Sequence, residues 1–171
     1  MQLNADRINF AKLDRVYVDA VFVIASHVPG SKDKFRADRM WARLIATKVK
    51  VCVSTLLLDE LWYKAIYLFH KRDFAGQDFP KSDPSLPAKY YAEIEKLTLA
   101  LLNLPNVELL PTPPQVQLFV DNTMKLMKTE SLYPRDAFHI AMAQAYGIQY
   151  VISNDAHLKN LSLATPLIIG F

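Results

Sequence analysis

The sequence predicts an α/β fold: a three-layer α/β/α sandwich with a central, mainly parallel twisted sheet. Short runs of β-branched and aromatic residues alternate with longer helical patterns, the order of elements that builds a parallel sheet with right-handed crossovers. The chain has 171 residues, 51% of them hydrophobic and 22% charged, which suits a single domain over residues 1–171 and excludes the disordered and collagen-like classes. No repeat or low-complexity tract competes with this interpretation.

The expected strands and helices follow one another along the chain. We expect strands at 15–19, 49–54, 107–110 and 148–153, with an edge strand at 167–169. We expect helices at 32–47, 56–71, 88–103, 114–128 and 134–146, and a short last helix that opens at Asn154 and Asp155. Ser31 and Ser54 are candidate N-caps, Pro134 suits a first helical position, and Gly147 is a C-terminal stop. Residues 74–87 hold three prolines and a glycine, which predicts an inserted surface loop.

Four acidic residues occur where a parallel sheet collects its ligands. Asp19 ends the strand at 15–19, Asp155 follows the strand at 148–153, and Glu60 lies about one turn into the helix after the strand at 49–54. Asp136 stands in the first turn of the helix at 134–146. Ligands of open α/β sheets bind outside the carboxyl ends of the strands, so we expect these carboxylates to meet at one edge.

Each of the three aspartates taken alone also has a local explanation, because Asp at helix starts and turns accepts bonds from free N–H groups. Glu60 lacks one, since large apolar residues surround it in LLLDELW. Its neighbour Asp59 is the one expected to face solvent. Four crowded carboxylates repel and raise one another's pKa unless a cation neutralises them. All-oxygen ligands select Mg²⁺ or Mn²⁺, which can drive hydrolysis of a phosphodiester.

The segments VYVDA, VSTLLLDEL, RDAFHIAMAQAYGI and YVISNDAHL, in that order, resemble the PIN-domain nucleases. The similarity covers almost the whole chain, and RDAFHIA with SND is its strongest part. It implies a fold related to the 5′ nucleases, single-strand endoribonuclease activity, and a Mg²⁺ or Mn²⁺ site built by Asp19, Glu60, Asp136 and Asp155. Ser153 matches the Ser or Thr of the family that assists the metal water network.

Many small members of the family resemble the toxin of VapC-type toxin–antitoxin pairs. We therefore expect RNA as the substrate, an antitoxin protein as a partner, and a homo-oligomer, a dimer, as the assembly. Two positions depart from the family pattern. Val21 stands where a polar residue is common, and His139 and Ile140 occupy the region where some members carry an extra acid. These departures bear on the number of metal ions, one or two, more than on the chemistry.

Charge and composition bear on partners and compartment. Lys and Arg outnumber Asp and Glu by 20 to 17, which permits a polyanionic partner. Arg36, Arg39 and Arg43 recur at helical spacing and are candidates for RNA binding, although a solvated helix face gives the same pattern. Cys52 is the single cysteine, which suits a reducing cytoplasm. No stretch resembles a membrane span or a signal peptide.

Other interpretations stay open at this stage. A catalytically silent PIN-like module that binds RNA or a protein is the main alternative, because of Val21 and the missing extra acid. A phosphatase that uses Asp19 as nucleophile is weaker, since haloacid-dehalogenase-like enzymes need an acid where Val21 stands. Three interpretations are open for Lys64, which lies one turn after Glu60: an ion pair with Glu60, a contact with a phosphate, or simple exposure to solvent. Three interpretations are also open for the loop at 74–87: a cap over an RNA groove, part of an interface, or an ordinary surface insertion.

Overall fold

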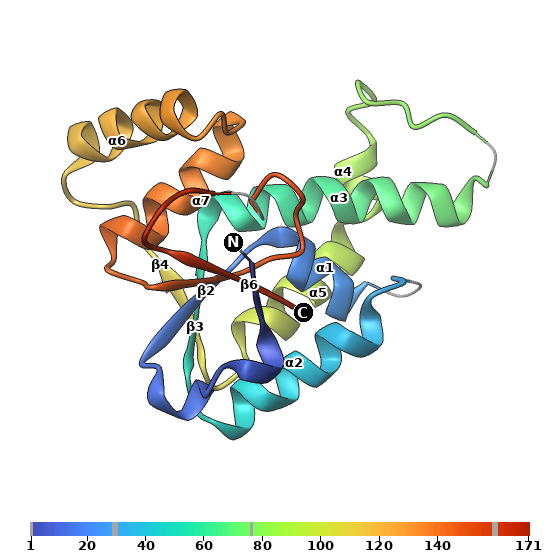
Figure 1. Cartoon of the computed structure of the whole chain (residues 1–171). Helices are drawn as coiled ribbons and strands as arrows, with labels where there is room; N and C mark the ends of the chain where they lie inside the picture. Colours follow the sequence, from blue (N-terminus) through green and yellow to red (C-terminus); the bar gives the residue numbers. More distant parts are fainter. Residues whose placement is uncertain (1, 29–30, 76, 159–160) are drawn as a thin grey trace.

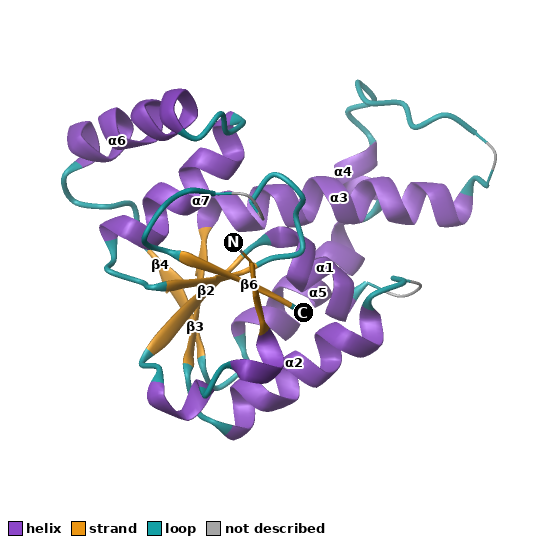
Figure 2. Ribbon diagram, viewed as in Figure 1, coloured by secondary structure: helices purple, strands orange, loops and turns teal. Residues whose placement is uncertain are grey.

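The structure is a computed structural model that describes residues 2–28, 31–75, 77–158 and 161–171. Its strands form a six-stranded sheet in the order β1-β6-β5-β2-β3-β4, and all neighbours in it are parallel (Figure 1). The strands are β1 (Gln2–Asn4), β2 (Arg15–Val18), β3 (Lys50–Ser54), β4 (Val107–Leu110), β5 (Tyr150–Ile152) and β6 (Leu167–Gly170). Helices lie on both sides of this sheet (Figure 2), which confirms the predicted α/β/α arrangement.

The helices are arranged as the alternating pattern predicts. The α-helices are α1 (Ala20–His27), α2 (Lys34–Ala46), α3 (Thr55–Asp73), α4 (Leu86–Lys89), α5 (Tyr91–Leu102), α6 (Val116–Thr129) and α7 (Pro134–Ala145). Two 3-10 turns, η1 (Ala5–Arg7) and η2 (Phe10–Lys12), precede β2. In Figure 1, α3 extends beyond the sheet, and the inserted loop leads from its far end to α4. The loop is therefore shorter than predicted, because α4 takes up its end.

Alternation along the strands divides the core into two layers. Val16 and Val18 of β2 belong to a cluster with buried residues of α1, α2, α3 and α5. Between them, Tyr17 points to the other face and joins Cys52 in a cluster with residues of α6 and α7. Successive strand side chains point to opposite faces, so apolar residues at every strand position require helices on both sides.

Several local signals act as the sequence predicts. The Ser54 side chain caps α3 by accepting a bond from the Leu57 amide at 3.2 Å, which satisfies a free N–H group of the first turn. Pro134 begins α7, where its missing N–H costs no helical bond. Gly147 ends α7 with a φ of 64°, a left-handed conformation that glycine adopts without strain.

Four local predictions need correction. Helix α1 was not expected, because the run AVFVIASH is apolar on all sides and lacks a helical period. The short edge strand β1 was not expected either. Ser31 is not the N-cap of α2, since the helix begins at Lys34 after Asp33. The last helix predicted from Asn154 and Asp155 is wrong for the described part, where residues 156–158 form a turn, while 159–160 lie outside the described residues.

The strand order creates a switch point beside β2. The chain passes from β2 to β3 on one side, and β5 later pairs with the other side of β2. Crossovers on opposite sides leave a crevice at the carboxyl ends of the two central strands, which is where α/β sheets place ligands. Within the described residues, no helix combines the length and apolar character needed to cross a membrane.

Candidate active site

Asp19 lies at this switch point, directly after β2. Its side chain is 4% exposed and caps α1, because one carboxylate oxygen accepts a bond from the Phe22 amide at 2.9 Å. The other oxygen accepts a bond from the Ser153 hydroxyl. Burial raises the pKa of Asp19 to about 6, in spite of these two bonds. The structure thus confines a carboxylate that is costly to ionise at the end of the central strand.

Ser153 and Asp155 follow β5 and face Asp19 across the switch point. The Ser153 side chain is fully buried and its hydroxyl oxygen also accepts a bond from the Asp155 amide at 2.9 Å. The Asp155 carboxylate accepts a bond from the His157 amide at 2.7 Å, a local turn that replaces the predicted helix. Asp155 is close enough for its charge to raise the pKa of Asp19 further.

Asp136 lies in the first turn of α7. It is half-buried, and burial followed by the negative charge of Asp155 raises its pKa. The charge of Glu60 acts in the same direction. The four predicted acids therefore share one electrostatic environment, and we call Asp19, Glu60, Asp136 and Asp155 the acidic site.

Glu60 occupies the second turn of α3 and is held by the side chains of His139 and Arg135 rather than by amides. One of its oxygens lies 3.1 Å from Nε2 of His139, and the other lies 3.6 Å from Nε of Arg135. The Glu60 side chain is 16% exposed, whereas that of Asp59 is 62% exposed and lies 3.4 Å from the same guanidinium. As predicted, Asp59 is the member of the pair that faces solvent.

A buried hydrogen-bond chain ties Glu60 to the sheet. The Tyr17 hydroxyl lies 2.8 Å from Nδ1 of His139 and 2.6 Å from the hydroxyl of Ser54. A carboxylate only accepts, so Nε2 of His139 must carry the proton that it donates to Glu60. Burial raises the pKa of Tyr17 well above its usual value, which keeps its hydroxyl protonated as a donor. Residues of β2, β3 and α7 thus fix one carboxylate on α3.

The carboxylate oxygens of the acidic site are the kind of ligand that a hard divalent cation prefers. Within the part of the chain that the structure describes, no three His, Cys, Asp or Glu side chains converge closely enough to enclose an ion. The carboxylates present are nevertheless all-oxygen donors, and Asp19 and Asp136 both have raised pKa values that reflect burial and the charge of Asp155. A cation among them would relieve both costs, and Mg²⁺ and Mn²⁺ prefer such ligands.

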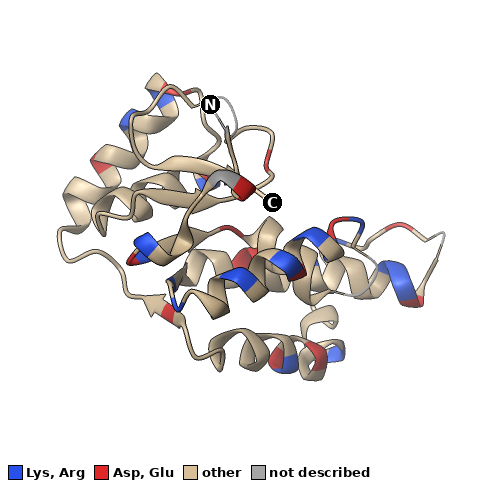
Figure 3. Ribbon diagram, turned by 60° about the horizontal axis from the view of Figure 1, so that its bottom comes forward, with Lys and Arg blue, Asp and Glu red and all other residues tan. Residues whose placement is uncertain are grey.

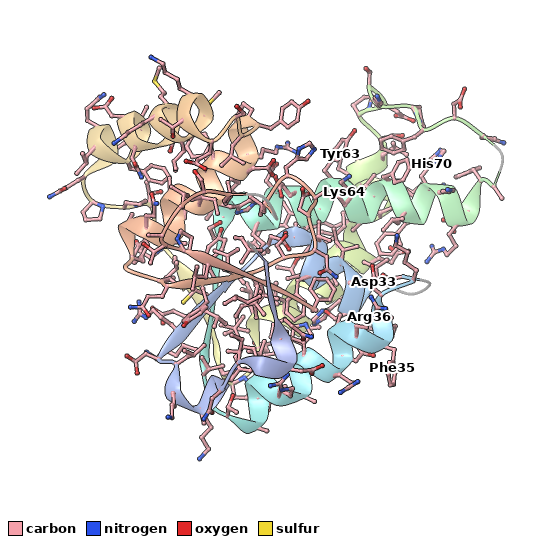
Figure 4. The ribbon with its side chains drawn as sticks, viewed as in Figure 1. Asp33, Phe35, Arg36, Tyr63, Lys64 and His70 are labelled. Carbon is pink, nitrogen blue, oxygen red and sulfur yellow. The ribbon has the colours of Figure 1, made fainter. Side chains whose placement is uncertain are left out.

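The three predicted RNA-binding arginines of α2 differ in their surroundings. Arg43 donates to the carbonyls of Ala5 and Ile8 at 3.0 and 3.1 Å, so it ties η1 to α2. All three arginines line a cleft of about 790 Å³ between α2, β1 and the C-terminal residues. Figure 4 shows Arg36 beside Asp33 at the start of α2. In the view of Figure 3, Lys and Arg positions are interspersed with Asp and Glu positions along the ribbon. RNA binding by these arginines stays a prediction.

Sequence reasoning overlooked the groups that surround Glu60. Tyr17 stands in the middle of a buried strand, where its hydroxyl requires a partner, and this signal was available. His139 is also buried, at 2% exposure. Its contact with Tyr17 joins residues 122 positions apart, a pairing that no local pattern encodes.

Comparison with known proteins identifies the family and a structure of similar fold. The model of the PIN domain family matches residues 16–163. Among solved structures, the chain is similar to the crystal structure of Mycobacterium tuberculosis VapC20, a Sarcin-Ricin loop cleaving toxin, with a TM-score of 0.55 and 19% identity over 88% of this chain and 99% of that one. A comparison with curated proteins finds no match. Because the family model spans most of its length, the chain belongs to the PIN domain family.

Proposed function

We propose that this chain is a Mg²⁺- or Mn²⁺-dependent endoribonuclease that hydrolyses a phosphodiester bond of RNA. One observation carries the proposal: Asp19 is a buried carboxylate at the switch point of the sheet, within the electrostatic reach of Asp155. Carboxylates are almost never fully buried unless a partner compensates their charge. Membership of the PIN domain family supports nuclease chemistry at this site, since PIN domains as a family are nucleases.

The residues of the acidic site would divide the work as follows. Asp19, Asp136, Asp155 and Glu60 would hold the ion, which when bound activates water and stabilises the charge that develops on the phosphodiester. Ser153 orients Asp19 through their hydrogen bond, and the Asp155 amide fixes Ser153 in turn. Because their pKa values are raised, Asp19 and Asp136 bind protons more readily than ordinary carboxyls. Metal binding should therefore release protons.

We extend the proposal to the biological setting of the activity. The likeness in fold to VapC20, itself a toxin that cleaves RNA, supports a role as the toxin of a toxin–antitoxin pair in the cytoplasm, with an antitoxin protein and a second copy of the chain as partners. We expect an adjacent reading frame that encodes a small DNA-binding protein, and we expect that protein to co-purify with the chain. A gene without such a neighbour would instead favour a housekeeping ribonuclease.

The activity is tested with purified chain, single-stranded RNA and Mn²⁺. Asp19→Asn is expected to slow cleavage by at least about a hundredfold, as for loss of one electrostatic group in other active sites. Asp14→Asn is the matched control, because Asp14 is an exposed acid before β2, at the other end of the same strand. It should cleave like the wild type, and excess EDTA should stop both.

Two outcomes would count against the proposal. Cleavage that persists in EDTA, or at the wild-type rate in Asp19→Asn, would show that the acidic site does not catalyse it. RNA binding without any cleavage would favour the silent module. Val21, which replaces a polar residue of the family pattern, is 39% exposed. The silent module is therefore the specific alternative that RNA binding without cleavage would support.

A further inference from the structure

A line of tyrosine and lysine side chains runs along α3 away from the acidic site. Tyr63, Lys64, Tyr67 and Lys71 follow Glu60 at intervals of three, four, seven and eleven residues, which places them along one side of a helix. We call these four residues the α3 stripe. The two tyrosines are 41% and 38% exposed, and both lysines are exposed. With about 1.5 Å of rise per residue, the stripe extends roughly 16 Å beyond Glu60.

The inserted loop folds back onto the stripe. The ring of Phe79 stands edge-on to both tyrosines, with centroids 6.0 Å from that of Tyr63 and 5.3 Å from that of Tyr67. Beside this contact lies a groove of about 500 Å³, whose lining includes two lysines, Lys71 and Lys81, and one acid, Asp78. Figure 4 shows Tyr63, Lys64 and His70 in order along α3 toward the loop. The stripe thus ends in a concave, basic and aromatic surface.

Neither the core nor α5 covers the side of α3 that carries the stripe. The core side is formed by Leu57, Leu61 and Ala65, each with no exposed surface. Trp62, on another side, donates to the hydroxyl of Thr98 on α5 at 2.9 Å. The core and α5 therefore occupy other directions. Phe79 of the inserted loop packs on the two tyrosines, and the stripe keeps its lysines and about two fifths of each tyrosine in solvent.

We propose that the α3 stripe and the groove beside the inserted loop bind the single-stranded RNA that extends from the acidic site, an inference that rests on the proposed ribonuclease function. Proteins bind single strands by stacking bases on aromatic rings and by placing basic groups along the backbone, and the stripe offers both in alternation. Because it begins one turn after Glu60, a strand with its scissile phosphate at the acidic site reaches the stripe within a few nucleotides.

Binding is measured by fluorescence anisotropy in an Asp19→Asn background, which prevents turnover, with labelled oligouridines of about 12 and about 4 nucleotides. The pair Tyr63→Leu/Tyr67→Leu should weaken binding of the longer strand at least about tenfold. The pair Lys64→Gln/Lys71→Gln should lower its salt slope by about 1.4, or about 0.7 for each phosphate that a lysine no longer neutralises. Both pairs should weaken binding of the short strand less than that of the longer one, because fewer of its nucleotides can lie along the stripe.

Two further variants separate stacking from folding. Tyr63→Phe/Tyr67→Phe keeps the rings and should bind like the parent, while Tyr91→Leu/Lys96→Gln removes an exposed tyrosine and lysine from α5 and should have no effect. Unchanged binding in both stripe pairs, or an equal loss in the α5 control, overturns the proposal. A stripe pair that binds RNA normally but fails to bind a co-expressed antitoxin would assign the surface to a protein instead. A parent chain that binds neither strand removes the proposed function together with this inference.

Discussion

The two sides of the acidic site are stabilised in opposite ways. Asp19 follows a strand, lies in the core and accepts its bonds from neutral donors, the Phe22 amide and the Ser153 hydroxyl. Glu60 lies on a helix, and its two oxygens face an imidazole and a guanidinium. The strand-borne carboxylate is therefore fixed in the core without a basic partner, whereas the helix-borne one lies between an imidazole and a guanidinium.

This difference indicates where a bound cation would contribute most. Burial raises the pKa of Asp19 to about 6, so its charge is costly near neutral pH in the absence of an ion. Glu60 already has two partners in the protein. To bind an ion, it would have to exchange His139 or Arg135 for that ion. If the acidic site binds an ion as proposed, Asp19 would gain most from it, and Glu60 would be a ligand whose release depends on its protein partners.

The largest expected effect concerns the cost of burying Asp19. A folded pKa of about 6, against an ordinary value of 3.8, means that the proton on Asp19 stabilises the folded chain. That stabilisation is complete below the ordinary value and is lost as pH rises through about 6. In metal-free buffer near pH 7.5, Asp19→Asn should therefore be more stable than the wild type, by at most about 3 kcal/mol.

Urea unfolding at about pH 7.5 and about pH 4 measures this difference, which should shrink to nearly nothing at the lower pH. Asp14→Asn, a variant of an exposed acid, should show no such pH dependence. A variant of Asp19 that is less stable than the wild type at both pH values would show that its hydrogen bonds outweigh the cost of its charge.

A slightly smaller effect distinguishes Glu60 from its neighbour. Mn²⁺ should stabilise the wild type by roughly 2.7 kcal/mol at a hundred times its dissociation constant. Glu60→Gln should lose most of this gain, and Asp59→Asn should keep it, because Asp59 faces solvent with 62% of its side chain exposed. Melting curves with and without Mn²⁺ provide the measurement. The reverse pattern would make Asp59 the ligand, and no shift in any variant would favour the silent module.

The buried hydrogen-bond chain predicts an effect of intermediate size. Tyr17→Phe removes the hydroxyl between Ser54 and His139, which leaves buried polar atoms without their partner and should destabilise the chain by about 1–2 kcal/mol. Affinity for Mn²⁺ should also fall about tenfold, because Glu60 loses the orientation that His139 gives it. Calorimetric titration with Mn²⁺ tests the second effect.

The matched control for this prediction is Tyr146→Phe. The Tyr146 hydroxyl donates to the carbonyl of Pro111 at 2.8 Å, outside the acidic site. Its removal should change stability slightly and leave Mn²⁺ affinity unchanged. If Tyr17→Phe lost stability but kept its affinity, the buried chain would serve the core alone and not the position of Glu60.

The sequence predicted best what local chemistry and topology determine. Capping by Ser54, the stop at Gly147 and the positions of Asp19 and Asp155 after parallel strands all follow from short-range signals and one rule of sheet topology. Helix α1 was not predictable by periodicity, because α2 and α3 both contact it and its residues are apolar on every side. Such a segment has no polar face to reveal its period.

The partners of Glu60 could not be predicted for a different reason. The sequence indicated only that a carboxylate among apolar residues requires a positive group. Which group this is depends on how α7 crosses α3, since Arg135 and His139 reach Glu60 over 75 and 79 positions of the chain. Side-chain direction between distant helices is a product of packing, and no spacing rule within one segment determines it.

The smallest effect concerns Arg135, the exposed cation beside Glu60. Its side chain is 53% exposed and lies 3.4 to 3.6 Å from the two acids of α3, so solvent screens both pairs and Arg135→Gln should change stability by less than about 1 kcal/mol. Affinity for Mn²⁺ should rise about two- to threefold, since the variant removes a positive charge that competes with the ion for Glu60. The gain should decrease in high salt. Arg72→Gln, which breaks an exposed pair with Glu93 at 3.7 Å, should leave Mn²⁺ affinity unchanged. Weaker Mn²⁺ binding in Arg135→Gln would mean that the guanidinium holds Glu60 ready for the ion instead of competing with it, and the contrast between the two sides of the site would then lie in their burial alone.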